Sequence, residues 1–161
     1  MSCLLSIAKR NGAFRSAQTV GLAGAALAAL FLLNTPSYAQ SVRLAATLSG
    51  TQEVPATSTK GTGTLSATYD DTTKKLSWSV TYSGLTGTPV AAHFHGPAQP
   101  GTNAPVEVPA PHAEKNPIQG TAVLTSKEAS DLLGGNMYFN IHTKAHPAGE
   151  IRGQVKEAKP S

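Results

Sequence analysis

The chain has 161 residues and a formal net charge of +4, with 13 Lys and Arg against nine Asp and Glu. This excess lies at the start, because residues 1–39 hold three basic and no acidic residues, which leaves ten basic against nine acidic residues in the remainder. A nearly neutral chain without a basic run excludes nucleic acid and anionic membrane surfaces as the main partners.

The N-terminal segment has the three parts of a secretory signal peptide. Its positive residues are Lys9, Arg10 and Arg15. An apolar run of 14 residues follows at 20–33, and the small residues that a signal peptidase reads lie at 37–39. A membrane-spanning helix needs about 20 apolar residues, which makes an uncleaved anchor the weaker interpretation. We therefore predict that residues 1–39 are removed, that 40–161 form one mature domain without a membrane span, and that the protein is periplasmic or secreted.

Cysteine chemistry is not expected in the mature chain. Cys3 is the only cysteine, and it lies in the segment predicted to be removed. The mature chain would then have no disulfide, no thiolate metal ligand and no cysteine nucleophile. About 122 residues are enough for a hydrophobic core without a disulfide.

Short segments in which apolar and polar residues alternate follow one another along the rest of the chain, as is typical of strands with one buried face. The seven segments are 42–48, 65–69, 76–82, 90–95, 121–125, 137–143 and 150–155. A short polar turn at 70–73 joins the second and third segments into the clearest hairpin. The expected core anchors are Trp78, Tyr82, Phe94 and Phe139.

Two of the segments that connect the predicted strands differ from the strands in composition. Residues 96–117 carry six prolines, which forbid a regular helix and disfavour a central strand. Residues 126–133 predict one short helix, with Ser126 as a candidate N-cap and Gly134-Gly135 as the stop signal. About seven strands with regular turns and one short helix predict a single all-β domain, an antiparallel β-sandwich with Greek-key connections.

The strands at 90–95, 137–143 and 150–155 carry polar side chains at alternate positions. The apolar positions, expected to face the core, are Phe94, Phe139, Ile141 and Ile151. The positions on the opposite face are His93, His95, Asn140, His142, Glu150 and Arg152. If the three strands are neighbours, these polar and imidazole groups gather in one patch of the sheet.

One hypothesis for this patch is a metal site. His93 and His95 project to the same side with Cα atoms about 6.5–7 Å apart, and a neighbouring strand about 4.8 Å away can add His142. Neutral imidazoles suit copper, zinc or nickel. His146 lies in a following loop, before Pro147, and can swing towards the other three.

The alternative is a structural polar layer without metal. His93 and His95 would then bond loop carbonyls. Glu150 and Arg152, on one face of one strand, would steady the strand of Asn140 and the proline-rich connection. Buried polar groups need partners, and a long loop that covers a sheet needs points of attachment.

Three ordered motifs resemble the CHRD domain, a module first named from chordin and also found singly in exported bacterial proteins. The motifs are L-S-G-T-Q-E-V-P at 48–55, H-F-H-G-P-A at 93–98, and Y-F-N-I-H-T at 138–143 followed by H-P-A-G-E-I-R-G-Q-V at 146–155. The resemblance spans roughly residues 42–155. Two positions depart from the family pattern: Ala56 replaces the second proline of the first motif, and His146 replaces the usual asparagine.

The resemblance implies an extracellular β-sandwich with no established catalytic activity, similar in fold to the Greek-key barrel of copper/zinc superoxide dismutase; an immunoglobulin-like architecture is the alternative. The copper site of that dismutase also uses an H-x-H strand, which favours the metal hypothesis. The chain lacks that enzyme's disulfide cysteines and an evident zinc-binding Asp, which argues against dismutase activity. Fold similarity by itself does not establish function.

No sequence motif for another enzyme class is present, since G-x-S-x-G, H-E-x-x-H and P-loop patterns do not occur. We therefore expect a non-catalytic exported module with a structural or interaction role towards an unidentified protein or cell-surface partner. The alternative function is a periplasmic copper- or zinc-binding protein, redox-active if the metal is copper. Its candidate ligands are His93, His95, His142 and His146.

Overall fold

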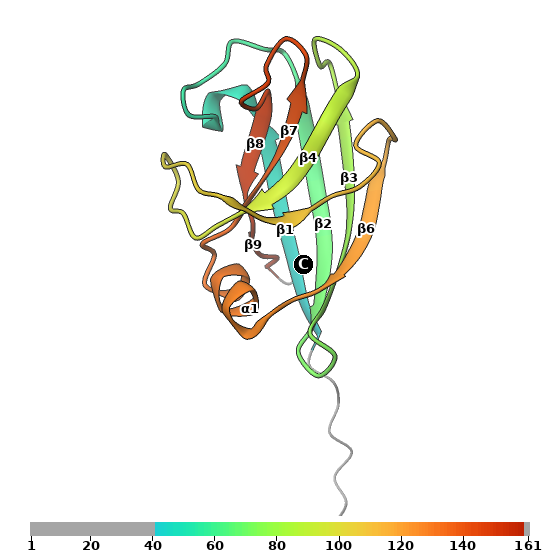
Figure 1. Ribbon diagram of the computed structural model, residues 1–161, viewed down its shortest axis with the longest axis vertical. Coiled ribbons are helices and arrows are strands. Elements are labelled where there is room, and N and C mark those ends of the chain that lie inside the picture. Colours follow the sequence, from blue (N-terminus) through green and yellow to red (C-terminus); the bar gives the residue numbers. More distant parts are fainter. Residues whose placement is uncertain (1–40, 160–161) are drawn as a thin grey trace, which may run out of the picture. The chain divides into compact units, whose positions relative to one another are not determined.

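The computed structural model describes residues 41–159, in which nine strands form one strongly curved antiparallel sheet (Figure 1). The predicted signal peptide, residues 1–39, lies outside the described residues. The strands are β1 (Ser41–Ser49), β2 (Thr62–Asp70), β3 (Lys75–Ser83), β4 (Pro89–His95), β5 (Val106–Pro109), β6 (Ile118–Val123), β7 (Tyr138–Thr143), β8 (Ile151–Gln154) and β9 (Lys156–Glu157). A 3-10 turn, η1 (Gly50–Gln52), follows β1, and a helix, α1 (Ser126–Leu133), precedes β7. Among these residues, no helix has the length and apolar character needed to cross a bilayer.

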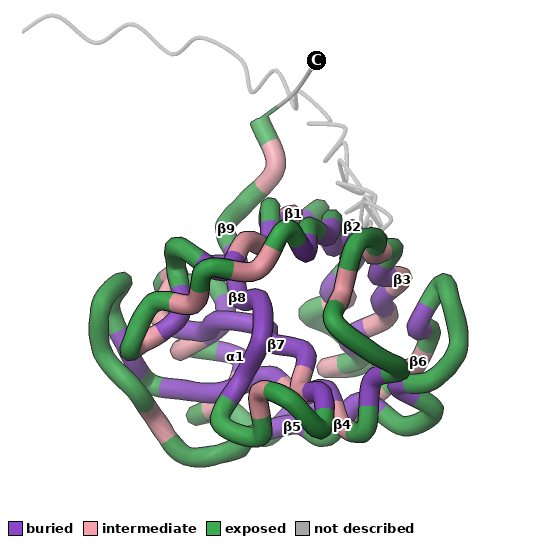
Figure 2. The backbone as a smooth tube through the Cα atoms, turned by 90° about the horizontal axis from the view of Figure 1, so that it is seen from above, coloured by how far each residue is buried: buried purple, intermediate pink, exposed green. Residues whose placement is uncertain are grey.

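The strand order is β5-β4-β7-β8-β1-β2-β3-β6, with β9 beside β1. β1 joins the two halves of the sheet, because Ser49 at its end pairs with Arg152 of β8. The two halves face each other across buried residues (Figure 2). Long connections return β6 to the side of β3 and β7 to the side of β4, as in Greek-key sheets. The predicted all-β antiparallel sandwich is thus confirmed, in a form that closes almost into a barrel.

The hydrophobic core lies between the two halves and follows the period-two pattern of the sequence. In β1, β2 and β3 every second residue is buried over most of the strand. The Trp78 ring packs edge-on against Phe94 with centroids 5.2 Å apart, and Phe94 packs against Phe139 at 4.9 Å. The fourth expected anchor, Tyr82, lies at the margin of the core instead, where its hydroxyl donates to the carbonyl of Glu114.

All seven predicted strands are present, and the structure adds two short ones. β5 lies inside the proline-rich connection, and β9 has two residues. β5 is the edge strand of its half. A proline without an N–H group is tolerated there, because the outer side of an edge strand has no ladder to interrupt. Strands of two to four residues are too short to produce a recognisable alternation.

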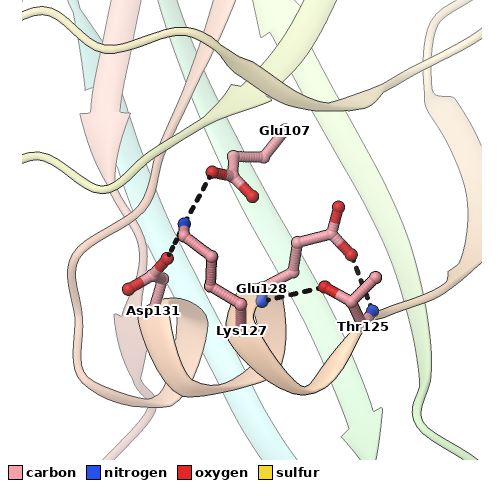
Figure 3. A network of polar contacts seen from close by, with 5 residues as sticks. All are labelled: Glu107, Thr125, Lys127, Glu128 and Asp131. Carbon is pink, nitrogen blue, oxygen red and sulfur yellow. Dashed lines mark hydrogen bonds and ion pairs between the residues drawn. The ribbon is translucent and has the colours of Figure 1, made fainter.

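The helix covers the predicted residues, but its N-cap is Thr125 and not Ser126. Oγ1 of Thr125 accepts a hydrogen bond from the backbone N–H of Glu128, and the Glu128 carboxylate accepts one from the N–H of Thr125 (Figure 3). This reciprocal pair is a capping box. It gives the chain a defined exit from β6 into the connection that leads to β7.

β8 passes very close to β1 at Gly153, and this contact gives a first prediction. A Cβ on Gly153 would collide with the backbone carbonyl of Thr47. Gly153→Ala is therefore expected to lower the free energy of unfolding by about 1–3 kcal/mol, the usual cost of overpacking. Urea denaturation measures the change. Gly87→Ala is the matched control, because the new Cβ would meet no atom within 4 Å; equal losses in the two variants would contradict the prediction.

Candidate metal centre

The polar face lies on the outer side of β4, β7 and β8. The register places His93 opposite Asn140, and Asn140 opposite Arg152. The outer face of a sheet is often solvated, but here only 8% of His95 and 2% each of Asn140 and Arg152 remain exposed. Residues 96–105 fold back over the face and bond to it. Their cover makes the part of the face around His95, Asn140 and Arg152 a second, polar interior, while His93 and His142 remain partly exposed.

Three imidazoles meet on this face. Nδ1 of His93 lies 3.2 Å from Nε2 of His142. One ring nitrogen from each of His93, His95 and His142 lies within 4.8 Å of the other two. The rings of His93 and His95 are nearly perpendicular, with centroids 5.4 Å apart. The structure thus brings together three of the four histidines selected from the sequence, and this cluster could hold a metal ion.

Loop carbonyls determine which nitrogen is protonated in two of these rings. Nδ1–H of His95 donates to the carbonyl of Ala104 at 2.9 Å, and Nδ1–H of His142 donates to that of Pro147 at 3.0 Å. A carbonyl only accepts, so in both neutral rings the proton is on Nδ1 and Nε2 keeps its lone pair. Nε2 of His95 is buried and has no hydrogen-bond partner among the described residues. Metal-binding histidines usually have this arrangement.

The spacing of His93 and His142 fits a small transition-metal ion, whereas the nitrogen of His95 lies within 4.8 Å of the other two and would have to move closer to bind the same ion. Two nitrogens bound to tetrahedral zinc at 2.0–2.1 Å are about 3.3 Å apart. The distance between Nδ1 of His93 and Nε2 of His142 is 3.2 Å. These two atoms share a hydrogen bond, so binding a metal through both requires the proton on His93 to leave Nδ1. Three imidazoles leave a fourth position for water or another ligand, and this donor set suits zinc and copper.

The environment favours neutral rings. Burial lowers the pKa of His93 to about 4, and the neighbouring rings of His142 and His95 add to the effect. Burial also lowers the pKa of His142, against the raising effect of the Pro147 carbonyl and with a further lowering by His95. Neutral imidazole is the form that binds metal. At neutral pH, therefore, no positive charge on His93 or His142 has to be removed before a metal binds.

Arg152 lies on the covered face opposite Asn140 and is among the largest fully buried side chains. Its guanidinium carbon lies 3.9 Å from the centre of the Tyr138 ring, and its nitrogens donate to Oδ1 of Asn103 and to the carbonyl of Thr102. Tyr138 in turn stacks on His95, with centroids 4.9 Å apart and an interplanar angle of 3°. The sequence analysis did not choose Tyr138 as a site residue, although the alternation along β7 places it on the same face as Asn140 and His142.

The carboxylate of Glu150 bonds elsewhere. Glu150 precedes β8, beyond the last pair of the β7–β8 ladder. It accepts hydrogen bonds of 2.6–2.8 Å from Thr59, Thr86 and Thr143. Burial raises the pKa of this carboxyl, but the bonds outweigh burial and hold the pKa below its usual value. The expectation that Glu150 and Arg152 share one face was wrong, because Glu150 lies outside the strand that would impose the alternation.

His146 lies outside the group of three imidazoles. It is partly exposed, in the loop between β7 and β8, where its backbone exchanges hydrogen bonds with Thr143. It lines a hollow of about 370 Å³ together with Glu53. His146 thus lines this hollow and is not a member of the group formed by His93, His95 and His142.

Glu53 is a polar residue that was not selected from the sequence, although it belongs to the first motif. Its side chain is 6% exposed, and Oε1 has no hydrogen-bond partner among the described residues. Burial raises the pKa of its carboxyl to about 7, although Arg152 and the backbone N–H of Val54 lower it. Glu53 is therefore a buried acid that can be neutral near physiological pH.

Glu53→Gln is expected to stabilise the protein more at pH 7 than at pH 4. The carboxyl ionises near pH 4.5 in the unfolded chain and near pH 7 in the folded one, so raising the pH through this range favours the unfolded state. Between pH 4 and pH 7 the free energy of unfolding of the wild type should therefore fall by about 3 kcal/mol through this carboxyl, and that of the uncharged variant should not. Urea denaturation at both pH values measures the difference. His93 also makes the stability depend on pH, with the opposite sign, but its contribution is the same in both proteins. A stability difference between wild type and variant that does not change with pH would contradict the prediction.

The nearly closed sheet and the imidazole cluster on its outer face define an all-β domain with a candidate metal centre. The model of the CHRD domain matches residues 44–155, from β1 to the residue after β8. The chain therefore belongs to the CHRD-domain family, as its three sequence motifs predicted. No match was found among curated proteins, and none among solved structures.

Proposed function

We propose that this chain is an exported CHRD domain that binds one zinc or copper ion through His93, His95 and His142. The carrying observation is that three ring nitrogens converge within 4.8 Å, with Nε2 of His95 buried and without a partner among the described residues. The proposal of export to the periplasm or the cell exterior rests on the sequence pattern of residues 1–39 alone.

A polar layer without metal is the competing interpretation. It accounts for the bonds from His95 and His142 to loop carbonyls. It leaves the buried Nε2 of His95 unpaired, which costs about 1–3 kcal/mol in a folded protein. A bound metal would use that lone pair and offset the cost, so the metal interpretation accounts for one more observation.

In this proposal the metal has a structural role. The metal would join β4 to β7. Because the rings of His95 and His142 donate to the carbonyls of Ala104 and Pro147, fixing these rings would also hold the two loops in place. Rigid loops suit a non-catalytic module that meets a protein or cell-surface partner outside the cytoplasm, because less conformational entropy is lost on binding. Copper in the same position would add redox activity to this role.

Metal titration of the purified protein tests the proposal. Calorimetry with zinc and with copper, together with elemental analysis, is expected to show one ion per chain. The melting temperature should rise with metal, because a ligand at 100 times its Kd adds about 2.7 kcal/mol to the stability of the folded state. A protein that binds neither ion with this stoichiometry and gains no thermal stability would overturn the proposal.

A further inference from the structure

We infer that Arg152 is the positioning residue of this metal centre. It sets both the ring plane of His95 and the nitrogen that carries the proton, so that the Nε2 lone pair is directed to the metal. The inference rests on the proposed metal binding and adds the residue that prepares the site. Arg152 lies in a different strand from His95, and two separate sets of contacts connect them.

The first connection runs through aromatic rings. The guanidinium of Arg152 lies 3.9 Å from the centre of the Tyr138 ring, a cation–π contact. On the sheet, Tyr138 is the register partner of His95, and the two rings stack with an interplanar angle of 3°. Tyr138 is 3% exposed. Turning the His95 ring would break this stack, so the plane of His95 follows that of Tyr138, which Arg152 supports.

The second connection runs through the loop. Arg152 donates from Nη1 to Oδ1 of Asn103 at 3.0 Å and from Nη2 to the carbonyl of Thr102 at 2.9 Å. The next residue, Ala104, accepts the Nδ1–H bond of His95 through its carbonyl and donates its N–H to the Tyr138 hydroxyl. Arg152 thus holds the loop segment whose carbonyl keeps the His95 proton on Nδ1.

The chemistry of arginine suits both tasks at once. A guanidinium is planar and carries five donors in fixed directions, so it can lie on an aromatic ring and bond two oxygens together, which a lysine ammonium cannot do. Arg152 is 2% exposed, and no carboxylate lies within ion-pair distance of it among the described residues. A buried cation that forms no ion pair is costly. Its charge acts at longer range on the Glu53 carboxyl, and its direct contacts are with Tyr138 and the loop.

His142 provides an internal reference. Its Nδ1–H bond goes to Pro147, in the loop between β7 and β8, whereas the side-chain bonds of Arg152 go to Thr102 and Asn103. Loss of the guanidinium should therefore disturb the protonated nitrogen of His95 and leave that of His142 unchanged. General unfolding or loosening would affect both rings.

Nitrogen-15 NMR of the histidine rings and zinc calorimetry on the full chain, wild type and Arg152→Met, test the inference. In the metal-free wild type, His95 is expected in the Nδ1–H form alone. In Arg152→Met, His95 should show a mixture of both neutral forms while His142 keeps one. Zinc affinity should fall about 10–100-fold, as is usual when the support of a metal ligand is removed. Arg152→Lys should not restore it.

Two further variants separate positioning from instability. Val80→Ala alters a buried residue of β3, in the other half of the sheet, and should lower stability without changing the His95 signals or the zinc affinity. If Arg152→Met does not fold, Asn103→Ala removes one guanidinium contact from an exposed loop residue and should weaken zinc binding by a smaller factor. If Arg152→Met or Asn103→Ala binds zinc as tightly as the wild type and its His95 ring shows only the Nδ1–H form, the inference about Arg152 is wrong, but the proposed metal binding still stands. A wild type that binds no zinc would overturn the proposed function as well.

Discussion

His95→Ala is expected to reduce the affinity for zinc and copper by more than 100-fold. The variant removes one of three ligands, and it removes the one whose lone pair is buried without a partner among the described residues. Loss of a ligand should exceed the 10–100-fold effect of losing a ligand's support. His142→Ala should have the same effect, and the double variant should lose little more, because the ligands act as a unit. Calorimetry measures the affinities.

The control for this experiment is His112→Ala. His112 is exposed and lies outside the group of imidazoles, so metal affinity and metal-dependent melting should match the wild type. In metal-free His95→Ala, the carbonyl of Ala104 loses its donor and the unpaired Nε2 is removed as well, so these two effects on the stability of the metal-free protein oppose each other. If His95→Ala and His112→Ala bind metal equally well, His95 is not a ligand.

Glu150→Ala is expected to lower the free energy of unfolding by about 3–5 kcal/mol. The variant leaves three threonine hydroxyls and the backbone N–H of Thr86 without their common acceptor. Removing one partner from a buried charged network typically has an effect of this size. Glu150→Gln should cost less, because an amide keeps one acceptor oxygen. Urea denaturation at pH 7 measures both changes.

The pH dependence gives Glu150 a second test. Its carboxyl has a pKa below the usual value in the folded state, so its bonds contribute stability above the unfolded pKa of about 4.5. This contribution is lost as the pH falls through the folded pKa. Glu150→Gln should remove that part of the acid dependence. The control is Glu157→Ala, which alters an exposed carboxylate of β9 and should change the free energy of unfolding by less than about 0.5 kcal/mol. If Glu150→Ala loses no more stability than this control, the hydrogen bonds of Glu150 do not stabilise the fold as predicted.

Much of the fold could be predicted because its signals are local. A strand with one buried face must alternate, and residues 41–49, 62–70 and 75–83 do so over their whole length. The helix was predicted from its flanking residues, with an error of one position at the cap. β5 was missed because four residues among prolines carry no periodic signal. Tyr82 was placed in the core although it lies at the margin, because alternation does not show where a sheet ends.

The candidate site could be predicted only in part. That His93 and His95 point to one side follows from strand geometry, since every second side chain shares a face. His142 lies beside His93 and His95 only because β7 pairs with β4 in this register. A register shift of one residue would turn the His142 side chain towards the core. Glu150 was misplaced because the alternation was extended beyond the start of β8.

The amino-acid sequence by itself determined the family, the class of fold and the presence of a strand that carries two imidazoles on one side. These properties depend on residues that are neighbours along the chain. Only the tertiary structure decided that His142 meets His93, from which it is separated by 49 positions. It also decided that carbonyls of two separate loops direct the lone pairs of His95 and His142 away from those loops. Such contacts depend on how distant segments pack against each other, and no local pattern encodes them.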